Sequence, residues 1–269
     1  MIKTVVFSFD LFDWNFLMSF LSFCARFLSL VASLILIELG FSSSVAVAQI
    51  TATGDVAPTY DGTDPWTVSG VLSIGNADSG SLTIAGGSVV NSDSVEINEI
   101  NSQATITGAG SQWNIEESTS LFTNLDFEVL DGAHVNTGSF SSIGDSNIRI
   151  SGQGSRLTTD SVSFQATNAS NNWTVDDGAT MLIEAFGFSF FGTDGSSLTI
   201  SGADTRVETR SLDLGNDQLF VNLDDGAYLK TGEFGFQDVS NSSGIGGTLN
   251  ISGGVMEVDG IVGLSLIHI

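Results

Sequence analysis

The chain has 269 residues and carries 31 acidic against 7 basic side chains, which gives a formal net charge of −24. Nucleic acid and anionic lipid are bound mainly through Lys and Arg, so this charge excludes nucleic-acid binding. The single cysteine, Cys24, cannot form a disulfide within the chain.

Residues 1–48 are predicted to form a secretory signal peptide. Arg26 precedes a short apolar stretch, and the small residues that end at Ala48 form an A-x-A cleavage site. The apolar stretch is shorter than the roughly 20 residues that span a bilayer. An uncleaved anchor is the alternative, because the residues before Arg26 are also apolar. Translation from Met18 instead of Met1 would leave a signal of ordinary length.

Residues 49–67 contain both prolines among Gly, Asp and Thr, and they predict a lead-in or N-terminal cap. Residues 68–263 form a repeat region in which two glycine motifs alternate. The motif V/L-x-D-G-A occurs at 129–133, 175–179 and 223–227, and the motif I-T/S-G at 106–108, 150–152, 200–202 and 251–253. A period of about two dozen residues indicates a solenoid, a propeller or an array.

The repeat predicts an all-β fold, a right-handed parallel β-helix (β-solenoid) of roughly eight coils. In runs such as Leu198-Thr199-Ile200 apolar and polar residues alternate, as they do on a strand with one buried face. The glycines supply the positive φ of a sharp corner. One unit is too small to bury its apolar side alone, so neighbouring coils must stack at about 4.8 Å per rung, and the repeat region should be about 40 Å long.

Residues at a common offset from the motif glycines are expected to point inward and to fill the bore. An aromatic binding groove along Phe186, Phe188, Phe190 and Phe191 is the alternative for the densest part of this set. The expected inward residues are Phe140, Phe186 and Phe234, Ser142, Phe188 and Phe236, and Val162, Phe164, Leu212 and Leu214.

The segment 106–114, ITGAGSQWN, resembles the T-G-x-G-S-x-W segment in repeats of bacterial autotransporter passengers, and 81–89, SLTIAGGSV, is similar to its partner segment. Later units depart from the pattern: Arg156 and Arg206 take the place of Trp113, and Ser201–Asp204 lacks the second glycine. The resemblance implies a secreted passenger displayed at the Gram-negative cell surface. It also implies an outer-membrane barrel in a C-terminal part beyond this chain.

Residues 264–269, LSLIHI, end the repeat abruptly. They match the translation of a transposon end sequence used in preparing sequencing libraries, so we interpret them as a sequencing-adapter artefact. A natural apolar tail is the alternative. On the first interpretation the natural C-terminus is missing from this chain.

The sequence predicts no catalytic, cofactor-binding or metal-binding residue. His134 is the only histidine between residue 48 and the tail and is expected on the surface, so neither a nucleophilic triad nor a histidine-based metal site can form. The best carboxylates occupy turns two coils, or about 10 Å, apart, too far to share one calcium ion. They are interpreted as turn-stabilising residues, although an Asp-Asp pair in one turn could hold a weak ion. These carboxylates are Asp131, Asp176, Asp177, Asp224 and Asp225.

The expected function is a structural stalk or an adhesin-like binding surface without catalysis. Asn- and Ser-rich loops at 168–172 and 240–243 are suited to polar contact with a glycan or another surface protein. One alternative is a carbohydrate-active β-helix enzyme, a polysaccharide lyase or hydrolase, which a cleft of convergent carboxylates with Arg or Lys would favour. The other is an extracellular-matrix repeat protein with a C-terminal sorting signal. The sequence does not predict an oligomeric state.

Overall fold

The computed structural model describes residues 47–122, 124–165, 170–191, 195–213, 219–235 and 247–262. The predicted signal peptide therefore lies outside these residues except for its last two positions, and the segment 264–269 lies wholly outside them. The described residues form a β-solenoid, as the repeat predicts. Each coil contributes one strand to each of two facing sheets, here called sheet A and sheet B.

Sheet A holds the shorter strands of the coils, and all but the first are parallel to their neighbours. Its strands are, in spatial order, β1 (Gln49–Gly54), β4 (Gly80–Ala85), β6 (Gln103–Thr107), β8 (Leu125–Leu130), β10 (Ser146–Ser151), β12 (Asn171–Asp176), β14 (Ser197–Ile200), β16 (Phe220–Asp224) and β18 (Thr248–Ser252).

Sheet B holds the longer strands, again parallel apart from the first. Its strands are β2 (Val56–Ala57), β3 (Trp66–Ile74), β5 (Val89–Ile97), β7 (Gln112–Leu121), β9 (His134–Ser142), β11 (Arg156–Gln165), β13 (Thr180–Phe191), β15 (Arg206–Asp213), β17 (Tyr228–Gly235) and β19 (Val255–Val262).

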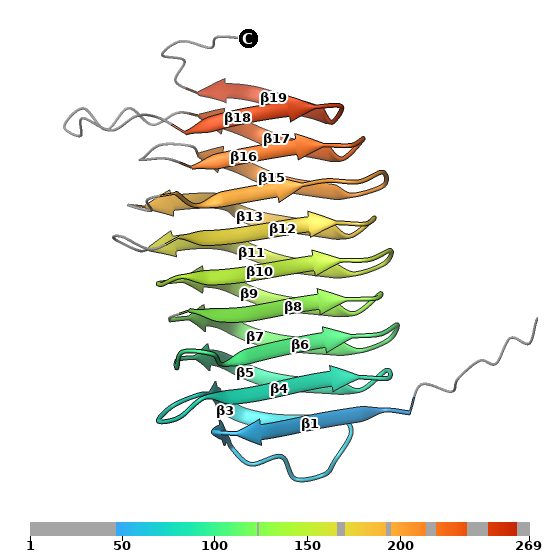
Figure 1. Cartoon of the computed structure of the whole chain (residues 1–269), viewed down its shortest axis with the longest axis vertical. Coiled ribbons are helices and arrows are strands. Elements are labelled where there is room, and N and C mark those ends of the chain that lie inside the picture. Colours follow the sequence, from blue (N-terminus) through green and yellow to red (C-terminus); the bar gives the residue numbers. More distant parts are fainter. Residues whose placement is uncertain are drawn as a thin grey trace, which may run out of the picture. The chain divides into compact units, whose positions relative to one another are not determined.

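The coil is right-handed (Figure 1). The strands of sheet A run from left to right in front, those of sheet B return behind them, and the chain climbs with each coil. This is the hand that strongly twisted parallel strands prefer. Eight strand pairs, from β4 with β5 to β18 with β19, agree with the roughly eight coils predicted, and β4 to β18 makes seven complete turns.

The N-terminal end of the solenoid is covered by the antiparallel strands β1 and β2, which pair with β4 and β3. Both strands run against the direction of the coils, so the parallel stacking of the solenoid ends at them. Asp55 fixes the cap, because its carboxylate accepts backbone N–H bonds from Asn76, Ala77 and Asp78, the shortest at 2.6 Å. The first regular solenoid strand begins at Trp66, close to the predicted boundary at residue 68.

An aromatic column runs through the middle of the bore. Neighbouring rings have centroids 5.2 to 6.2 Å apart, mostly edge to face, a geometry that adds to the stability gained from their burial. The fully buried members are Trp113, Phe127, Phe140, Trp173, Phe164 and Phe188. The predicted inward positions Val162, Leu212 and Phe234 are also buried, whereas Leu214 and Phe236 lie outside the described residues.

The prediction that Phe186 points inward is wrong: its side chain is 76% exposed, and Phe188 takes the inward place. The cause is a bulge in β13. Between Ile183 and Gly187 lie three residues, where β11 has only Asp160 between the partner residues. The register is restored at Phe188, which pairs with Leu212 of β15. The side chains of the remaining two phenylalanines in this run, 190 and 191, lie outside the description.

The arginines of the later units do not replace Trp113, contrary to expectation. Arg156 is in register with His134, and His134 with Gln112, so Arg156 lies on an outward-facing column. Leu157 continues the inward position of Trp113. The spacing from the motif glycine is the same in both units, so the expectation was displaced by one residue, and such a displacement exchanges the two faces of a strand.

Candidate binding surface

The predicted aspartates lie in the tight turns that join sheet A to sheet B. In the turn around Asp131 and Gly132 both residues have positive φ, 54° and 84°, and the N–H of Ala133 donates to the carbonyl of Leu130 at 3.1 Å. This is a type I′ turn, for which Asp-Gly is a preferred pair. Asp177 and Asp225 occupy the same position in later turns, with φ of 55° and 52°.

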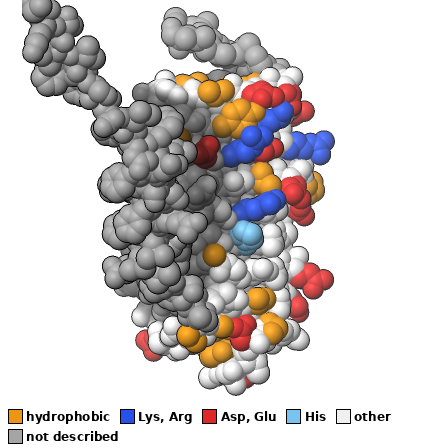
Figure 2. Space-filling model, turned by 90° about the vertical axis from the view of Figure 1, so that its right-hand side faces the viewer, with side chains coloured by type: hydrophobic (Ala, Val, Ile, Leu, Met, Phe, Trp, Pro, Cys, Tyr) orange, Lys and Arg blue, Asp and Glu red, His pale blue; other side chains and the backbone are white. Residues whose placement is uncertain are grey.

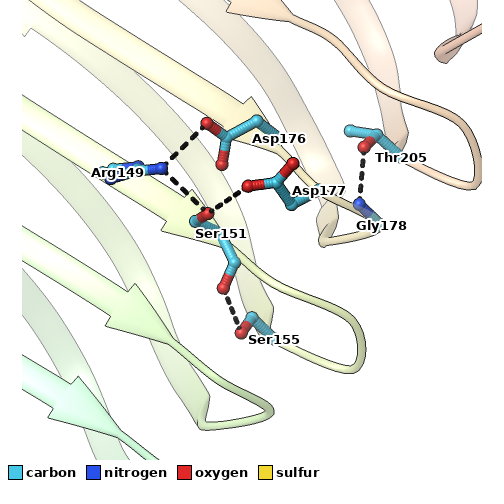
Figure 3. A network of polar contacts seen from close by, with 7 residues as sticks. All are labelled: Arg149, Ser151, Ser155, Asp176, Asp177, Gly178 and Thr205. Carbon is cyan, nitrogen blue, oxygen red and sulfur yellow. Dashed lines mark hydrogen bonds and ion pairs between the residues drawn. The ribbon is translucent and has the colours of Figure 1, made fainter.

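The alternation of the two motifs has a hydrogen-bonding explanation (Figure 3). The N–H of Gly178, in an Asp-Gly-Ala turn, donates to Oγ1 of Thr205 in the next turn at 2.9 Å. Gly132 donates in the same way to Oγ of Ser155, which in turn donates to the carbonyl of Ser151. Two of the three Asp-Gly-Ala turns thus bond to a hydroxyl of the turn that follows, which favours alternation of the two kinds of turn. In the third, Gly226 donates instead to the backbone carbonyl of Gly253 at 3.0 Å.

An ion pair and further side-chain hydrogen bonds link these turns (Figure 3). Arg149 binds Asp176 at 3.1 Å and Ser151 at 3.2 Å, and the Ser151 hydroxyl donates to Asp177 at 3.4 Å. Consecutive Asp-Gly turns are separated by a Ser turn, as the strand register requires. Among the residues that the structure describes, no group of three or more His, Cys, Asp or Glu side chains is placed to hold a metal ion. The contacts of these aspartates support their interpretation as turn residues.

The other predicted polar residues are dispersed. His134 is exposed at the start of β9, as expected, with Nε2 3.1 Å from the carbonyl oxygen of Gly154. Asn171, expected in a loop, is instead a fully buried residue of β12 whose side-chain oxygen accepts a bond from Ser142 at 2.6 Å. The loop 240–243 lies outside the described residues.

Sheet B has a bend in the middle of its strands, which the sequence did not predict. At four levels, two on each side of β13, a buried threonine donates its hydroxyl to the carbonyl two residues on, and the residue between them sits at the corner. The pairs are Thr137 with Ser139, Thr159 with Ser161, Thr209 with Ser211 and Thr231 with Glu233, at 2.6 to 3.0 Å. The signal that could have revealed this bend is the T-x-S that recurs in three of these four strands.

A shallow groove follows this bend over β13 to β19, with a volume of about 370 Å³. We call it the C-terminal groove. Its charged lining residues are Glu184, Glu208, Arg210, Lys230 and Asp259. Four of the five basic residues that follow residue 48 lie on strands β11, β15 and β17 of sheet B, and Figure 2 shows Lys and Arg side chains gathered among acids on the upper part of the molecule.

The bulge of β13 borders the C-terminal groove. The Arg210 guanidinium donates to the carbonyl of Ala185 at 3.3 Å, and the Ser211 hydroxyl donates to the carbonyl of Phe186 at 3.0 Å. Gly187 has a φ of 103°, and a Cβ there would lie 2.6 Å from the Ser211 carbonyl oxygen. Glycine therefore lets the bulge lie against β15, which fixes the backbone that carries the exposed Phe186 side chain.

Ion pairs link the outer column of the C-terminal groove. Lys230 binds Glu257 at 2.7 Å and Asp259 at 3.7 Å. The Tyr228 hydroxyl also donates to Glu257. Arg206 binds Glu208, and its guanidinium carbon lies 4.5 Å from the centre of the Tyr228 ring. The hydrogen bonds from Lys230 and Tyr228 lower the pKa of Glu257. The same bonds to Glu257 raise the pKa of Lys230 and of Tyr228.

A second groove of about 320 Å³ follows the same bend over β3 to β9. We call it the N-terminal groove. An amide ladder crosses it, in which Asn136 donates to Asn114 at 3.1 Å and Asn114 to Asn91 at 3.0 Å. Its charged lining residues are Asp93 and Glu116.

No protein-family model, no curated protein and no solved structure matches this chain. The fold and the surface chemistry are therefore the observations from which a function can be argued. No helix among the described residues is long and apolar enough to cross a membrane.

Proposed function

We propose that the chain is a secreted β-solenoid displayed at the cell surface, which serves as a stalk and binds an extracellular partner through the C-terminal groove. The observation that carries this proposal is the coincidence of the β13 bulge, an exposed phenylalanine and the basic residues Arg210 and Lys230 at one groove of sheet B. Departures from the local regularity of a scaffold are expected where function is located. The signal-peptide pattern of residues 1–48 and the resemblance of the repeats to autotransporter passengers support secretion.

Export is tested by producing the full chain in a Gram-negative host and sequencing the N-terminus of the exported protein. A start at Gln49 is expected. A full-length chain held in the inner membrane would contradict the proposal, because residues 1–48 would then be an anchor.

Binding is tested by coating beads with the full chain and measuring the retention of eukaryotic cells and of bacteria. Exchange of Arg210 and Glu184 for Gln should reduce retention, while Glu116→Gln in the N-terminal groove should leave it unchanged. Equal loss in both variants would assign the binding to the acidic surface in general.

A second candidate is a carbohydrate-active enzyme, because three carboxylates converge with Arg210 and Lys230 in the C-terminal groove. We place it second because Glu208 and Asp259 are held in ion pairs with Arg206 and Lys230, and the groove is shallow. A catalytic site more often excludes water around its reacting groups. Reducing or unsaturated ends released from a neutral or acidic polysaccharide, and lost in Glu184→Gln, would establish the enzyme instead.

A further inference from the structure

We infer that the C-terminal groove binds a neutral oligosaccharide that stacks a sugar ring on Phe186. This inference rests on the proposed function and names the chemical class of its ligand. Sugar rings have an apolar face of C–H groups and an edge of hydroxyls, so a site for them needs an exposed aromatic ring beside paired donors and acceptors.

The exposed aromatic ring is present, and the backbone that carries it is fixed by hydrogen bonds. Phe186 and Phe220 are the two exposed phenylalanines among the described residues, at 76% and 41%. Phe186 alone lies on a bulge that β15 fixes through two hydrogen bonds. Because the backbone beneath the ring is already fixed, ligand binding need not order this part of the chain.

The polar groups suit hydroxyls better than they suit a charged ligand. Each sugar hydroxyl both donates and accepts, and the groove offers carboxylates such as Glu184 as acceptors and Arg210 and Lys230 as donors. Its five charged lining residues carry three negative and two positive charges, so they nearly balance. The net charge of −24 on the chain repels polyanionic glycans at long range.

The groove also has the extent of a short oligomer. It follows the bend across the four strands from β13 to β19, which corresponds to about 14 Å at about 4.8 Å per strand. Phe186 lies beside the lining residues of the C-terminal groove, two positions after Glu184. Its carbonyl is bonded to Ser211, the neighbour of Arg210. The N-terminal groove follows the same bend, but among the described residues no basic side chain lines it and no exposed phenylalanine lies on its strands. It therefore serves as an internal control.

The inference is tested by calorimetric titration of the full chain with cellohexaose, mannohexaose, maltohexaose and, as an acidic comparison, hexagalacturonate. At least one neutral hexasaccharide should bind, and Phe186→Ala should weaken it about three- to tenfold, the range expected for loss of one aromatic contact. Phe220→Ala removes the other exposed phenylalanine ring, which lies on sheet A rather than sheet B, and should leave the affinity unchanged. Both residues are exposed, and an unchanged far-ultraviolet circular dichroism spectrum establishes that the variants fold.

Absence of binding by all three neutral hexasaccharides, equal affinity of Phe186→Ala and the wild type, or preference for hexagalacturonate would each overturn the inference. The cell-retention assay separates this failure from that of the proposed function. Retention that depends on Arg210 without any saccharide binding overturns the sugar ligand and leaves a protein partner. Retention that is unaffected by every groove variant overturns both.

Discussion

The N-terminal and C-terminal grooves occupy the same bend of sheet B, yet their chemistry differs. In the first, identical amides in register form a ladder from Asn91 to Asn136. In the second, the same column continues through Leu182, Glu208, Lys230 and Glu257 and is joined by ion pairs. Amides can bond to copies of themselves in every coil, whereas charges need an opposite neighbour. The backbone therefore fixes where the groove lies, and the side chains along this column decide what the groove can bind.

The strand register differs as well. At the bend, β7 has one residue more than its neighbours, while β13 has two more and exposes Phe186 there. The larger bulge thus lies beside the groove that has both acidic and basic side chains. For this reason we assign binding to the C-terminal groove. The two regions should respond alike to changes in the shared core and differently to changes in the grooves.

The largest effect is expected in the aromatic column that both regions share. Trp113 belongs to the N-terminal region and Trp173 to the coil just before the bulge, and both are fully buried. Exchange of either for Ala should lower the free energy of unfolding by about 3–5 kcal/mol, since it leaves a cavity between coils. Denaturant unfolding followed by circular dichroism measures this; a loss below about 1 kcal/mol would show that the column is not packed as described.

Exchange for Phe separates the two tryptophans. The ring N–H of Trp113 donates to Ser92 at 3.2 Å, whereas the buried N–H of Trp173 has no partner. Trp113→Phe loses a hydrogen bond, and Trp173→Phe removes an unsatisfied donor that costs about 1–3 kcal/mol. We expect Trp113→Phe to be the more destabilising; the opposite order would contradict the assigned hydrogen bonds.

The next effect concerns the turns beneath both grooves. Ser111 accepts the N–H of Gly87 at 3.0 Å, and Thr205 accepts that of Gly178 at 2.9 Å. Ser111→Ala and Thr205→Val should each cost about 1–3 kcal/mol, because a glycine N–H loses its partner. Thr199→Val, on the outer face of β14, is the matched control and should change the free energy of unfolding by less than about 0.5 kcal/mol. Equal effects in Thr205→Val and Thr199→Val would refute the explanation for the alternating motifs.

A smaller effect is expected at the second positive-φ position of the longer turns. Gly110 in the N-terminal region has a φ of 85°, and Asp204 in the C-terminal region has 66°. The left-handed conformation costs an ordinary residue about 1 kcal/mol. Asp204→Gly should therefore raise the midpoint of thermal unfolding, and Gly110→Asp should lower it. A fall in Asp204→Gly would mean that the aspartate side chain itself stabilises this turn.

The sequence was sufficient to predict the fold because turn chemistry and strand periodicity agree in every coil. Asp131 and Gly132 require a corner, and alternation in strands such as Leu198–Ile200 requires one buried face. The error at Phe186 arose because fixed offsets assume equal strand lengths, and two extra residues in β13 shifted the column. The error at Arg156 has another cause. Arg156 stands four residues after Gly152, as Gln112 stands four after Gly108, so an equal count from the glycines already places Leu157 at the position of Trp113.

The candidate site was predicted less well than the fold. Glu184, Arg210 and Asp259 lie far apart in the sequence, and only the stacking of β13, β15 and β19 brings them to one groove. Charged side chains carry no periodic signal when each coil has a different residue at the column. The repeated Thr-x-Ser of the bend was visible in the sequence, but its role depends on a side-chain bond to the backbone that spacing alone does not indicate.

The smallest expected effect distinguishes the grooves by pH. Hydrogen bonds from Lys230 and Tyr228 lower the pKa of Glu257 in the folded protein. Glu257 therefore contributes to the free energy of unfolding above its pKa in the unfolded chain, and this contribution is lost as the pH falls through the folded pKa. Glu257 raises the pKa of Lys230 in the folded protein. The contribution of Lys230 to the free energy of unfolding is therefore complete below its pKa in the unfolded chain and is lost as the pH rises through the folded pKa. Asp55 at the N-terminal cap has a pKa lowered by the N–H groups of Ala77 and Asp78, and it responds to acid alone.

Unfolding midpoints of the wild type, Glu257→Gln and Asp55→Asn, measured from acid to alkaline pH, test this contrast. The difference between the wild type and Glu257→Gln should be constant between about pH 5 and pH 10 and should shrink on both sides, since Glu257 is protonated in acid and Lys230 and Tyr228 lose their protons in alkali. The difference between the wild type and Asp55→Asn should shrink only in acid. If the Glu257 difference also persisted at alkaline pH, Lys230 and Tyr228 would not be its partners in solution, and the ionic column that sets the C-terminal groove apart from the amide ladder would be refuted.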